Sequence, residues 1–177
     1  ALPRRSPEEI DAETVRAVEL AQEECLRKGI TTFVDAGSTF ATIDRLRKMA
    51  EDRLLRMRLW VMVRDDNAVL RERLPAYRSI GAGHGFLTVR AIKRQLDGAL
   101  GSRGAWMLEP YTDDPSMTGF NTEPVADIEE TARLAIENGY QLCVHAIGDR
   151  ANRETLDLFE RTFRAHPDKH DLRWRIE

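Results

Sequence analysis

Short apolar runs rich in β-branched residues alternate along this chain with segments of helical periodicity, and no other feature constrains the fold as strongly. Strands are predicted at 30–34, 57–63, 87–93, 140–144 and 172–176. Helices are predicted before and between them, at 6–29, 42–51, 67–80, 123–138 and 149–165. A chain in which strands and helices alternate strictly forms a parallel sheet covered by helices. The predicted fold class is therefore α/β, with parallel strands and outer helices.

The first predicted helix carries both a start and a stop signal. Ser6 can cap the helix, Pro7 suits its first turn, and Glu9 completes a capping box with Ser6. Gly29 follows the last apolar position of the pattern and is expected to end the helix.

A weak internal repeat places a polar residue after two of the predicted strands. In Gly29–Gly37 and in Gly139–Ala146 a helix stops at glycine and a buried strand follows, with Asp35 or His145 just past its carboxyl end. In a (β/α)₈ barrel that end carries the active site. A doubly wound open sheet gives a similar alternation, so periodicity alone does not choose between the two architectures.

The number of strands bears on completeness. A closed barrel needs eight strands and typically about 250 residues, whereas five strands are predicted in these 177 residues. Five open parallel strands would leave two edges and an apolar face uncovered. We therefore predict that residues 1–177 form a single incomplete barrel domain of about five βα units, either a piece of a longer protein or a homo-oligomer. Arg173–Glu177 stops inside a predicted strand, which favours the piece.

The net charge and the apolar pattern limit which binding partners and which cellular compartment are expected. The net charge of -3 gives no broad basic field, so neither nucleic acid nor an anionic membrane surface is expected as a partner. No apolar run approaches the roughly 18 residues that span a bilayer, and residues 1–6 do not resemble a secretory signal. Cys25 and Cys143 are predicted to be reduced core thiols, which fits a cytoplasmic setting.

His145 is the first candidate for chemistry. It follows the apolar run Leu142–Val144, so its imidazole could point into a barrel mouth and bind a divalent metal. The competing interpretation is a core histidine that bonds a backbone carbonyl. Asp149, four residues on, is predicted to be the N-cap of the next helix.

Lys93 is the second candidate, at the end of the third predicted strand. A buried lysine loses its charge unless it is paired, and a neutral amine can react with carbon dioxide to give a carbamate that bridges two metal ions. The alternative is an ion pair between Lys93 and Asp97 or an exposed strand end, and taken by itself the pattern favours that alternative.

The glycine-rich stretch Gly98–Gly104 lies in a long predicted loop, 97–121. Its backbone N–H groups and Arg103 could hold an anion, so a phosphate-binding barrel enzyme is a third hypothesis. The stretch lacks the lysine of a P-loop and the spacing of a dinucleotide fingerprint, and a tight structural loop is the simpler interpretation. Asp35 is predicted to cap the turn that follows it.

Taken together, three segments resemble the amidohydrolase superfamily, in the branch called amidohydrolase family 3 (YtcJ-like, which includes N-substituted formamide deformylases). Ile92–Ala105, IKRQLDGALGSRGA, resembles the signature VK-x-x-x-DG-x-LGSR-x-A. Val144–Ala151 reads VHAIGDRA, as in the family's histidine block, and Arg175–Glu177 resembles RIEH without its histidine. Glu109–Gly119 also resembles the family, so the likeness covers nearly the whole chain.

This resemblance implies a (β/α)₈ barrel whose hydrolases use one or two divalent metals, commonly zinc, to activate water against a small-molecule substrate. Lys93 matches the lysine that can be carbamylated to bridge the metals, and His145 matches the metal-binding histidine after the fifth strand. The positions expected to contact substrate are Asp97, Gly98, Ser102 and Arg103.

Several of the family's residues have no counterpart here. The His-x-His pair after the first strand and the aspartate after the eighth are absent, and the histidine after the sixth strand would follow Glu177. Arg94 and Gln95 stand where apolar or aromatic residues are expected. Because open zinc sites use three protein ligands, we expect the parent protein to hydrolyse an amide or N-formyl C–N bond and the isolated chain to be inactive. The alternative is a non-catalytic (β/α) scaffold that self-associates.

Overall fold

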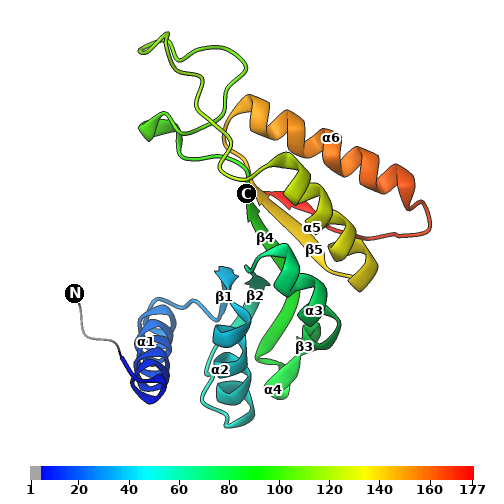
Figure 1. Ribbon diagram of the computed structural model, residues 1–177. Coiled ribbons are helices and arrows are strands. Elements are labelled where there is room, and N and C mark those ends of the chain that lie inside the picture. The colour runs from blue at the N-terminus through cyan, green and yellow to red at the C-terminus, as the bar shows by residue number, and fades with distance from the viewer. Residues whose placement is uncertain (1–4) are drawn as a thin grey trace. The chain divides into compact units, whose positions relative to one another are not determined.

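The computed structural model describes residues 5–177 (Figure 1). The chain divides into two compact units. The first unit contains residues 5–63 and 78–90, and the second contains residues 64–77 and 91–177. The elements that begin in the first unit are α1 (Pro7–Arg27), β1 (Thr32–Ser38), α2 (Phe40–Glu51), β2 (Arg58–Val63), β3 (Ser79–Gly81), α4 (Ala82–Gly85) and β4 (Leu87–Gln95). Those of the second unit are α3 (Asn67–Tyr77), the 3-10 turn η1 (Leu100–Ser102), α5 (Val125–Asn138), β5 (Gln141–His145), α6 (Asp149–Ala165) and β6 (Arg175–Ile176).

The start of α1 confirms the predicted capping box. Ser6 Oγ accepts a hydrogen bond from the backbone N–H of Glu9 at 3.2 Å, and Glu9 accepts one from the Ser6 N–H at 2.7 Å. These bonds satisfy two donors that the first helical turn would otherwise leave open. The helix ends as predicted before Gly29, whose φ of 78° belongs to the left-handed region that glycine adopts without strain.

In the first unit β1 and β2 pair in parallel, with Thr32 opposite Arg58 and Asp35 opposite Val61. The short strand β3 runs antiparallel to β4, and Ser79 is opposite Val89. This strand corrects the prediction of one helix over 67–80: α3 ends at Tyr77, and Ser79–Gly81 pairs with β4 instead of continuing the helix. The strict alternation of strands and helices is therefore interrupted by one antiparallel strand.

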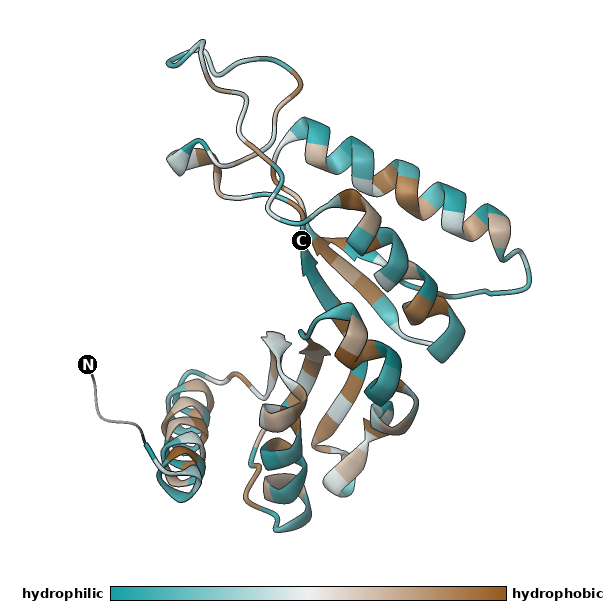
Figure 2. Cartoon of the chain, viewed as in Figure 1, coloured by the Kyte–Doolittle hydropathy of each residue, from teal (hydrophilic) through white to brown (hydrophobic). Residues whose placement is uncertain are grey.

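In the second unit the strands are parallel, as predicted. Register pairs Lys93 of β4 with Cys143 of β5, and Cys143 in turn with Arg175 of β6. Residues Leu142 to Val144 of β5 are fully buried, and Figure 2 shows the middle of this strand in the brown tones of apolar residues. A strand that is apolar on both faces is typical of a parallel sheet covered by helices.

Strand β6 is shorter than predicted. The pattern at 172–176 indicated a five-residue strand, but only Arg175 and Ile176 pair with β5. Asp171 and Arg173 have φ of 56° and 51°, which lies outside the extended region. The side chains of these two residues form an ion pair at 2.7 Å in that bend.

The long loop predicted between β4 and α5 is confirmed. From Asp97 to Asn121 the only regular elements are the turn η1 and an isolated bridge between Tyr111 and Asp114. Figure 1 shows the segment as an extended coil beyond β4. Its backbone makes internal hydrogen bonds, such as Met107 N–H to the Thr118 carbonyl at 2.8 Å, so it is ordered without being regular.

Two further observations bear on the sequence predictions. Cys25 and Cys143 both carry free thiols. No helix among residues 5–177 is long and apolar enough to cross a membrane. That the chain forms a single domain stays a prediction.

Candidate active site

Lys93 and His145 lie on the same face of two neighbouring strands. Parallel register sets Lys93 opposite Cys143 and Gln95 opposite His145, and side chains two residues apart on a strand share a face. Lys93 and His145 are thus one strand apart and two residues out of register, about 8 Å between Cα atoms from standard sheet spacings. The two predicted metal-binding side chains come together toward the carboxyl ends of β4 and β5.

Lys93 is held by a carboxylate that sequence reasoning did not identify. Its Nζ lies 2.6 Å from Glu177 Oε2, and Arg175 Nε donates to the other carboxylate oxygen at 2.7 Å. Burial raises the pKa of Glu177, but the hydrogen bonds from Lys93 and Arg175 outweigh it, so the pKa lies below its usual range. The predicted alternative, an ion pair of Lys93 with Asp97, is wrong because register brings Glu177 to the lysine instead.

His145 presents a buried nitrogen at this site. Its Nε2 is shielded from solvent and has no hydrogen-bond partner among residues 5–177. Asp97 Oδ1 lies 3.8 Å from it, which is too long for a hydrogen bond. A buried ring nitrogen that lacks a partner is costly unless something binds it. Nε2 is thus the ring nitrogen at which His145 could bind a metal, and its role as a ligand rather than a core histidine stays a prediction.

Asp97 is completely buried and bonds three backbone N–H groups. Its Oδ2 accepts from Trp106 at 2.8 Å and from Gly148 at 2.8 Å, and its Oδ1 accepts from Ile147 at 3.0 Å. The carboxylate thus ties the start of the long loop to the turn that follows His145. This geometry gives Asp97 a structural task, and its predicted contact with substrate stays a prediction.

The other predicted substrate residues lie within the same loop. Gly98 and Gly104 face each other, with a hydrogen bond from Gly98 N–H to the Gly104 carbonyl at 3.0 Å, and a Cβ added at Gly98 would lie 3.2 Å from the Gly104 Cα. Ser102 Oγ bonds the Ala99 carbonyl, and Arg103 pairs with Asp113 at 3.0 Å. The partner of Arg103 is a carboxylate of its own loop, as in a structural loop rather than an open anion cradle.

The prediction that Asp149 is the N-cap of α6 is wrong. The N-cap is Gly148, with φ of -66° and ψ of 151°, and Asp149 is the first helical residue. A Cβ at position 148 would lie 1.9 Å from the Trp106 carbonyl oxygen, so no residue with a capping side chain fits there. Asp149 Oδ1 instead accepts from the backbone N–H of Leu108 at 2.8 Å, a second tie between the loop and α6.

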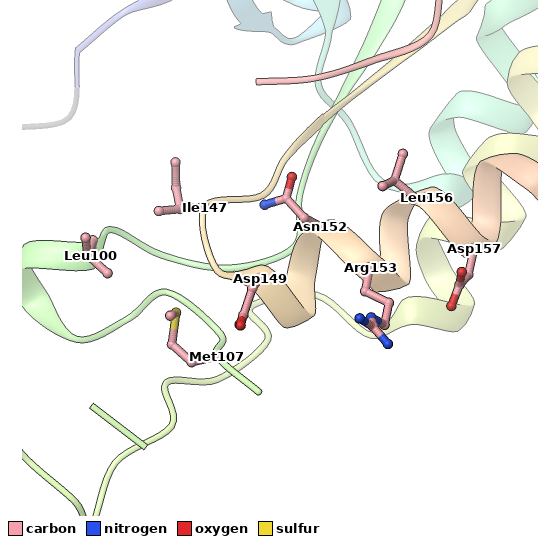
Figure 3. Close-up of a pocket in the computed structure, with 8 residues that line it drawn as sticks. All are labelled: Leu100, Met107, Ile147, Asp149, Asn152, Arg153, Leu156 and Asp157. Carbon is pink, nitrogen blue, oxygen red and sulfur yellow. The ribbon is translucent and has the colours of Figure 1, made fainter. Parts of the chain in front are cut away.

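A cavity of about 730 Å³ lies between this loop and α6, and Ile147, two residues after His145, contributes to its wall (Figure 3). Figure 3 shows polar side chains of α6 on one side and apolar side chains of the loop on the other. The lining residues are Leu100, Met107, Ile147, Asp149, Asn152, Arg153, Leu156 and Asp157.

Arg94 explains one of the departures noted in the sequence. It points away from Lys93, since neighbouring residues of a strand face opposite sides, and its guanidinium donates to Thr131 at 2.7 Å, to Asn67 at 2.7 Å and to the Asp65 carbonyl at 2.8 Å. Burial lowers the pKa of Arg94. An arginine is accommodated there because α3, α5 and the segment before α3 supply acceptors on that side of β4.

The sequence model of the amidohydrolase family matches residues 3–177. The chain belongs to the amidohydrolase family.

Known proteins resemble different lengths of this chain. This amidohydrolase-family chain is 28% identical over 169 residues to the protein LONG AFTER FAR-RED 3 of Arabidopsis thaliana, an alignment that covers 89% of the chain and 28% of that protein. It is 41% identical over 80 residues to the putative amidohydrolase YtcJ of Bacillus subtilis (strain 168), covering 45% of the chain and 14% of YtcJ.

Two crystal structures, each of an uncharacterized metal-dependent hydrolase, are similar to this amidohydrolase-family chain. The protein from Pyrococcus horikoshii OT3 is 28% identical with a TM-score of 0.74, over 86% of this chain and 31% of that one. The protein from Pyrococcus furiosus is 29% identical with a TM-score of 0.72, over 84% of this chain and 31% of that one. The chain thus spans less than a third of the length of each of the four proteins named here.

These likenesses confirm two predictions for the amidohydrolase-family chain: the family branch and the fold class of a partial (β/α)₈ barrel. They leave the roles of the site residues as predictions. Sequence reasoning missed Glu177 and Arg175 because both act through the register of β6. The one signal available was that Arg175 and Glu177 alternate along a predicted strand, as Lys93 and Gln95 do.

Proposed function

We propose that this protein contributes part of the active site of a metal-dependent hydrolase that cleaves an amide or N-formyl C–N bond of a small molecule with activated water. The observation that carries the proposal is that Lys93 and His145 lie on one face of the sheet, toward the carboxyl ends of β4 and β5. There, within residues 5–177, His145 Nε2 is buried and has no hydrogen-bond partner. Family membership and two similar metal-dependent hydrolases support it.

The donor set present here fits part of a metal site. His145 and Lys93 would hold a divalent metal, for which zinc is our choice because imidazole suits it. Among residues 5–177 no three His, Cys, Asp or Glu residues gather into a metal-binding group. Because open catalytic zinc sites use three protein ligands, the proposal places the remaining ligands outside the described residues, in a longer polypeptide.

When bound, such a metal lowers the pKa of a water molecule to about 7 and polarises a carbonyl group. The residues of this chain act around it. Asp97 fixes the turn after His145 and so orients the imidazole, while Lys93 must release Glu177 before its amine can be carbamylated. Arg175 already bonds Glu177 at 2.7 Å and can keep that carboxylate when Lys93 leaves.

Metal uptake tests the site directly. We expect isothermal titration of zinc into the protein to show weak binding, and we expect His145→Ala to reduce the affinity at least about tenfold, as loss of a ligand does. The matched control is His166→Ala, because His166 bonds the Thr162 carbonyl at the end of α6, away from the site. Equal zinc affinity in the wild type and His145→Ala would refute the ligand role of His145.

The bond type needs a separate assay. Sequencing the DNA on both sides of this reading frame shows which longer polypeptide should be produced for the assay. We expect the zinc-loaded longer protein to hydrolyse an N-formyl amine faster than an ester of matched size. Faster hydrolysis of the ester would contradict the proposed C–N specificity while leaving the metal site standing.

A second candidate function rests on the exposure of β1. Phe33 and Val34 are neighbours on opposite faces of this strand, and both side chains are about half exposed, at 47% and 48%. A strand that is apolar and exposed on both faces invites pairing with another chain. If the protein is a self-associating scaffold, light scattering will show dimers or larger species that Phe33→Lys converts to monomers; a wild-type monomer excludes this candidate.

A further inference from the structure

A second cavity, which the proposed hydrolase function does not use, lies in the first unit. It has a volume of about 520 Å³ and adjoins the amino ends of β2 and β4, whereas Lys93 lies toward the carboxyl end of β4. Its walls come from the last turn of α2, the segment that follows it, and the turn around α4. The lining residues are Ala50, Arg53, Leu55, Arg56, Gly83, His84 and Phe86.

The lining combines a basic rim with an apolar floor. The rim residues Arg53, Arg56 and His84 are exposed. Ala50 and Leu55 are buried, with exposed fractions of 1% and 4%. No lining residue is acidic. Within residues 5–177, the guanidinium groups of Arg53 and Arg56 form no ion pair. Such unpaired cations over an apolar floor suit an anion that carries an apolar group.

The acidic groups nearby do not cancel this charge. Arg53 and Arg56 also line an adjoining cavity with three residues of α1, namely Arg16, Glu19 and Glu23. Arg16 pairs with Glu19 at 3.5 Å, which leaves one glutamate against two arginines.

Two of the three basic residues hold strained backbone conformations. Arg53 has φ of 59° and His84 has φ of 61°, in the left-handed region that residues other than glycine rarely adopt. Arg53 occupies the position after the C-cap of α2, where glycine is the usual residue. Strain of this kind concentrates at sites that bind ligands.

The backbone around the cavity is fixed by packing and hydrogen bonds. Gly83 sits so close to Ala50 that an added Cβ would lie 2.4 Å from the alanine Cβ. Gln22 of α1 is 1% exposed, accepts from the Arg56 N–H at 2.6 Å and donates to the Leu54 carbonyl at 3.3 Å. The segment that carries both guanidinium groups is therefore already ordered before any ligand arrives.

We propose that this cavity binds a phosphate monoester whose alcohol part is apolar. The forked donors of Arg53 and Arg56 match phosphate oxygens in geometry and charge, and the apolar part packs on Leu55 and Phe86. The site stands independently of the proposed hydrolase function, because it shares no residue with the metal positions.

Phenyl phosphate, inorganic phosphate and benzoate serve as probes in thermal unfolding and isothermal titration at constant ionic strength. We expect phenyl phosphate to bind more tightly than inorganic phosphate, because only it fills the apolar floor, and more tightly than benzoate. Benzoate binding equal to that of phenyl phosphate would overturn the phosphate head group, and equal binding of inorganic phosphate would overturn the apolar part.

Two variants assign the site. Arg53→Gly removes a guanidinium and the strain together, so we expect it to raise the unfolding temperature while weakening phenyl phosphate about five- to tenfold. Arg56→Gln should weaken binding similarly. The control is Arg164→Gln, on the exposed face of α6, which should bind as the wild type does. Unchanged affinity in both cavity variants, or an equal loss in the control, would overturn the proposal.

Discussion

Replacing Asp97 by asparagine tests the most completely satisfied buried group of the candidate site. The carboxylate is 0% exposed and accepts three backbone N–H groups with its two oxygens. Asparagine keeps one oxygen and turns the other into an NH₂ donor. At least one backbone N–H would then face a donor instead of an acceptor.

The expected cost follows from these bonds. A buried donor left without an acceptor costs about 1–3 kcal/mol, and a hydrogen bond to a charged acceptor contributes about 1.5–3 kcal/mol. For Asp97→Asn we therefore expect a loss of about 3 kcal/mol in the free energy of unfolding, measured by urea denaturation at pH 7. That loss is a large fraction of the 5–15 kcal/mol typical of folded proteins.

Asp113→Asn is the matched control, because it removes an exposed carboxylate of the same loop that pairs with Arg103. We expect Asp113→Asn to unfold at nearly the same urea concentration as the wild type, because exposed ion pairs contribute little to stability. If Asp97→Asn unfolds within about 1 kcal/mol of the wild type, or no earlier than Asp113→Asn, the reasoning about the buried carboxylate fails.

Three further predictions rest on local geometry. Gly148→Ala should destabilise by about 2–3 kcal/mol in urea denaturation, because its Cβ would meet the Trp106 carbonyl, whereas Gly101→Ala, with nothing within 4 Å, should stay within about 1 kcal/mol of the wild type. The pKa of Glu177 is depressed in the folded state, so its contribution to stability is present above the ordinary value of 4.5 and is lost as pH falls through the lower folded pKa; between pH 5 and pH 3 the wild type should lose more stability than Glu177→Gln. Burial raises the pKa of Cys143 to about 12, so Ellman's reagent at pH 8 should modify this thiol only after unfolding, and rapid reaction in the folded Cys25→Ser variant would contradict its burial.

Periodicity predicted the helices of this chain better than the ends of its strands. The capping residues around α1 act locally, so Ser6, Glu9 and Gly29 could be interpreted without tertiary information. The antiparallel strand β3 and the shortened β6 could not, because one depends on Ser79 finding Val89 and the other on the left-handed turns at Asp171 and Arg173.

The candidate site divides in the same way. The ends of the predicted strands follow from local sequence, and they identified Lys93 and His145 as metal candidates, a role that stays a prediction. The partner of Lys93 could not be found by that reasoning, because Glu177 reaches it only through the register of β5 with β6. The structural role of Asp97 could not be predicted either. The three backbone N–H groups that donate to its carboxylate belong to residues 9, 50 and 51 positions further along the chain.

The way the long loop is anchored has a consequence for how this fold can diversify. Asp97 and Asp149 hold the loop through backbone N–H groups, which every residue except proline provides. These hydrogen bonds therefore place few demands on the loop's side chains, apart from glycines such as Gly98 and Gly119, where an added Cβ would crowd neighbouring backbone. Substitutions in the loop can therefore change its surface while the neighbouring His145 keeps its position.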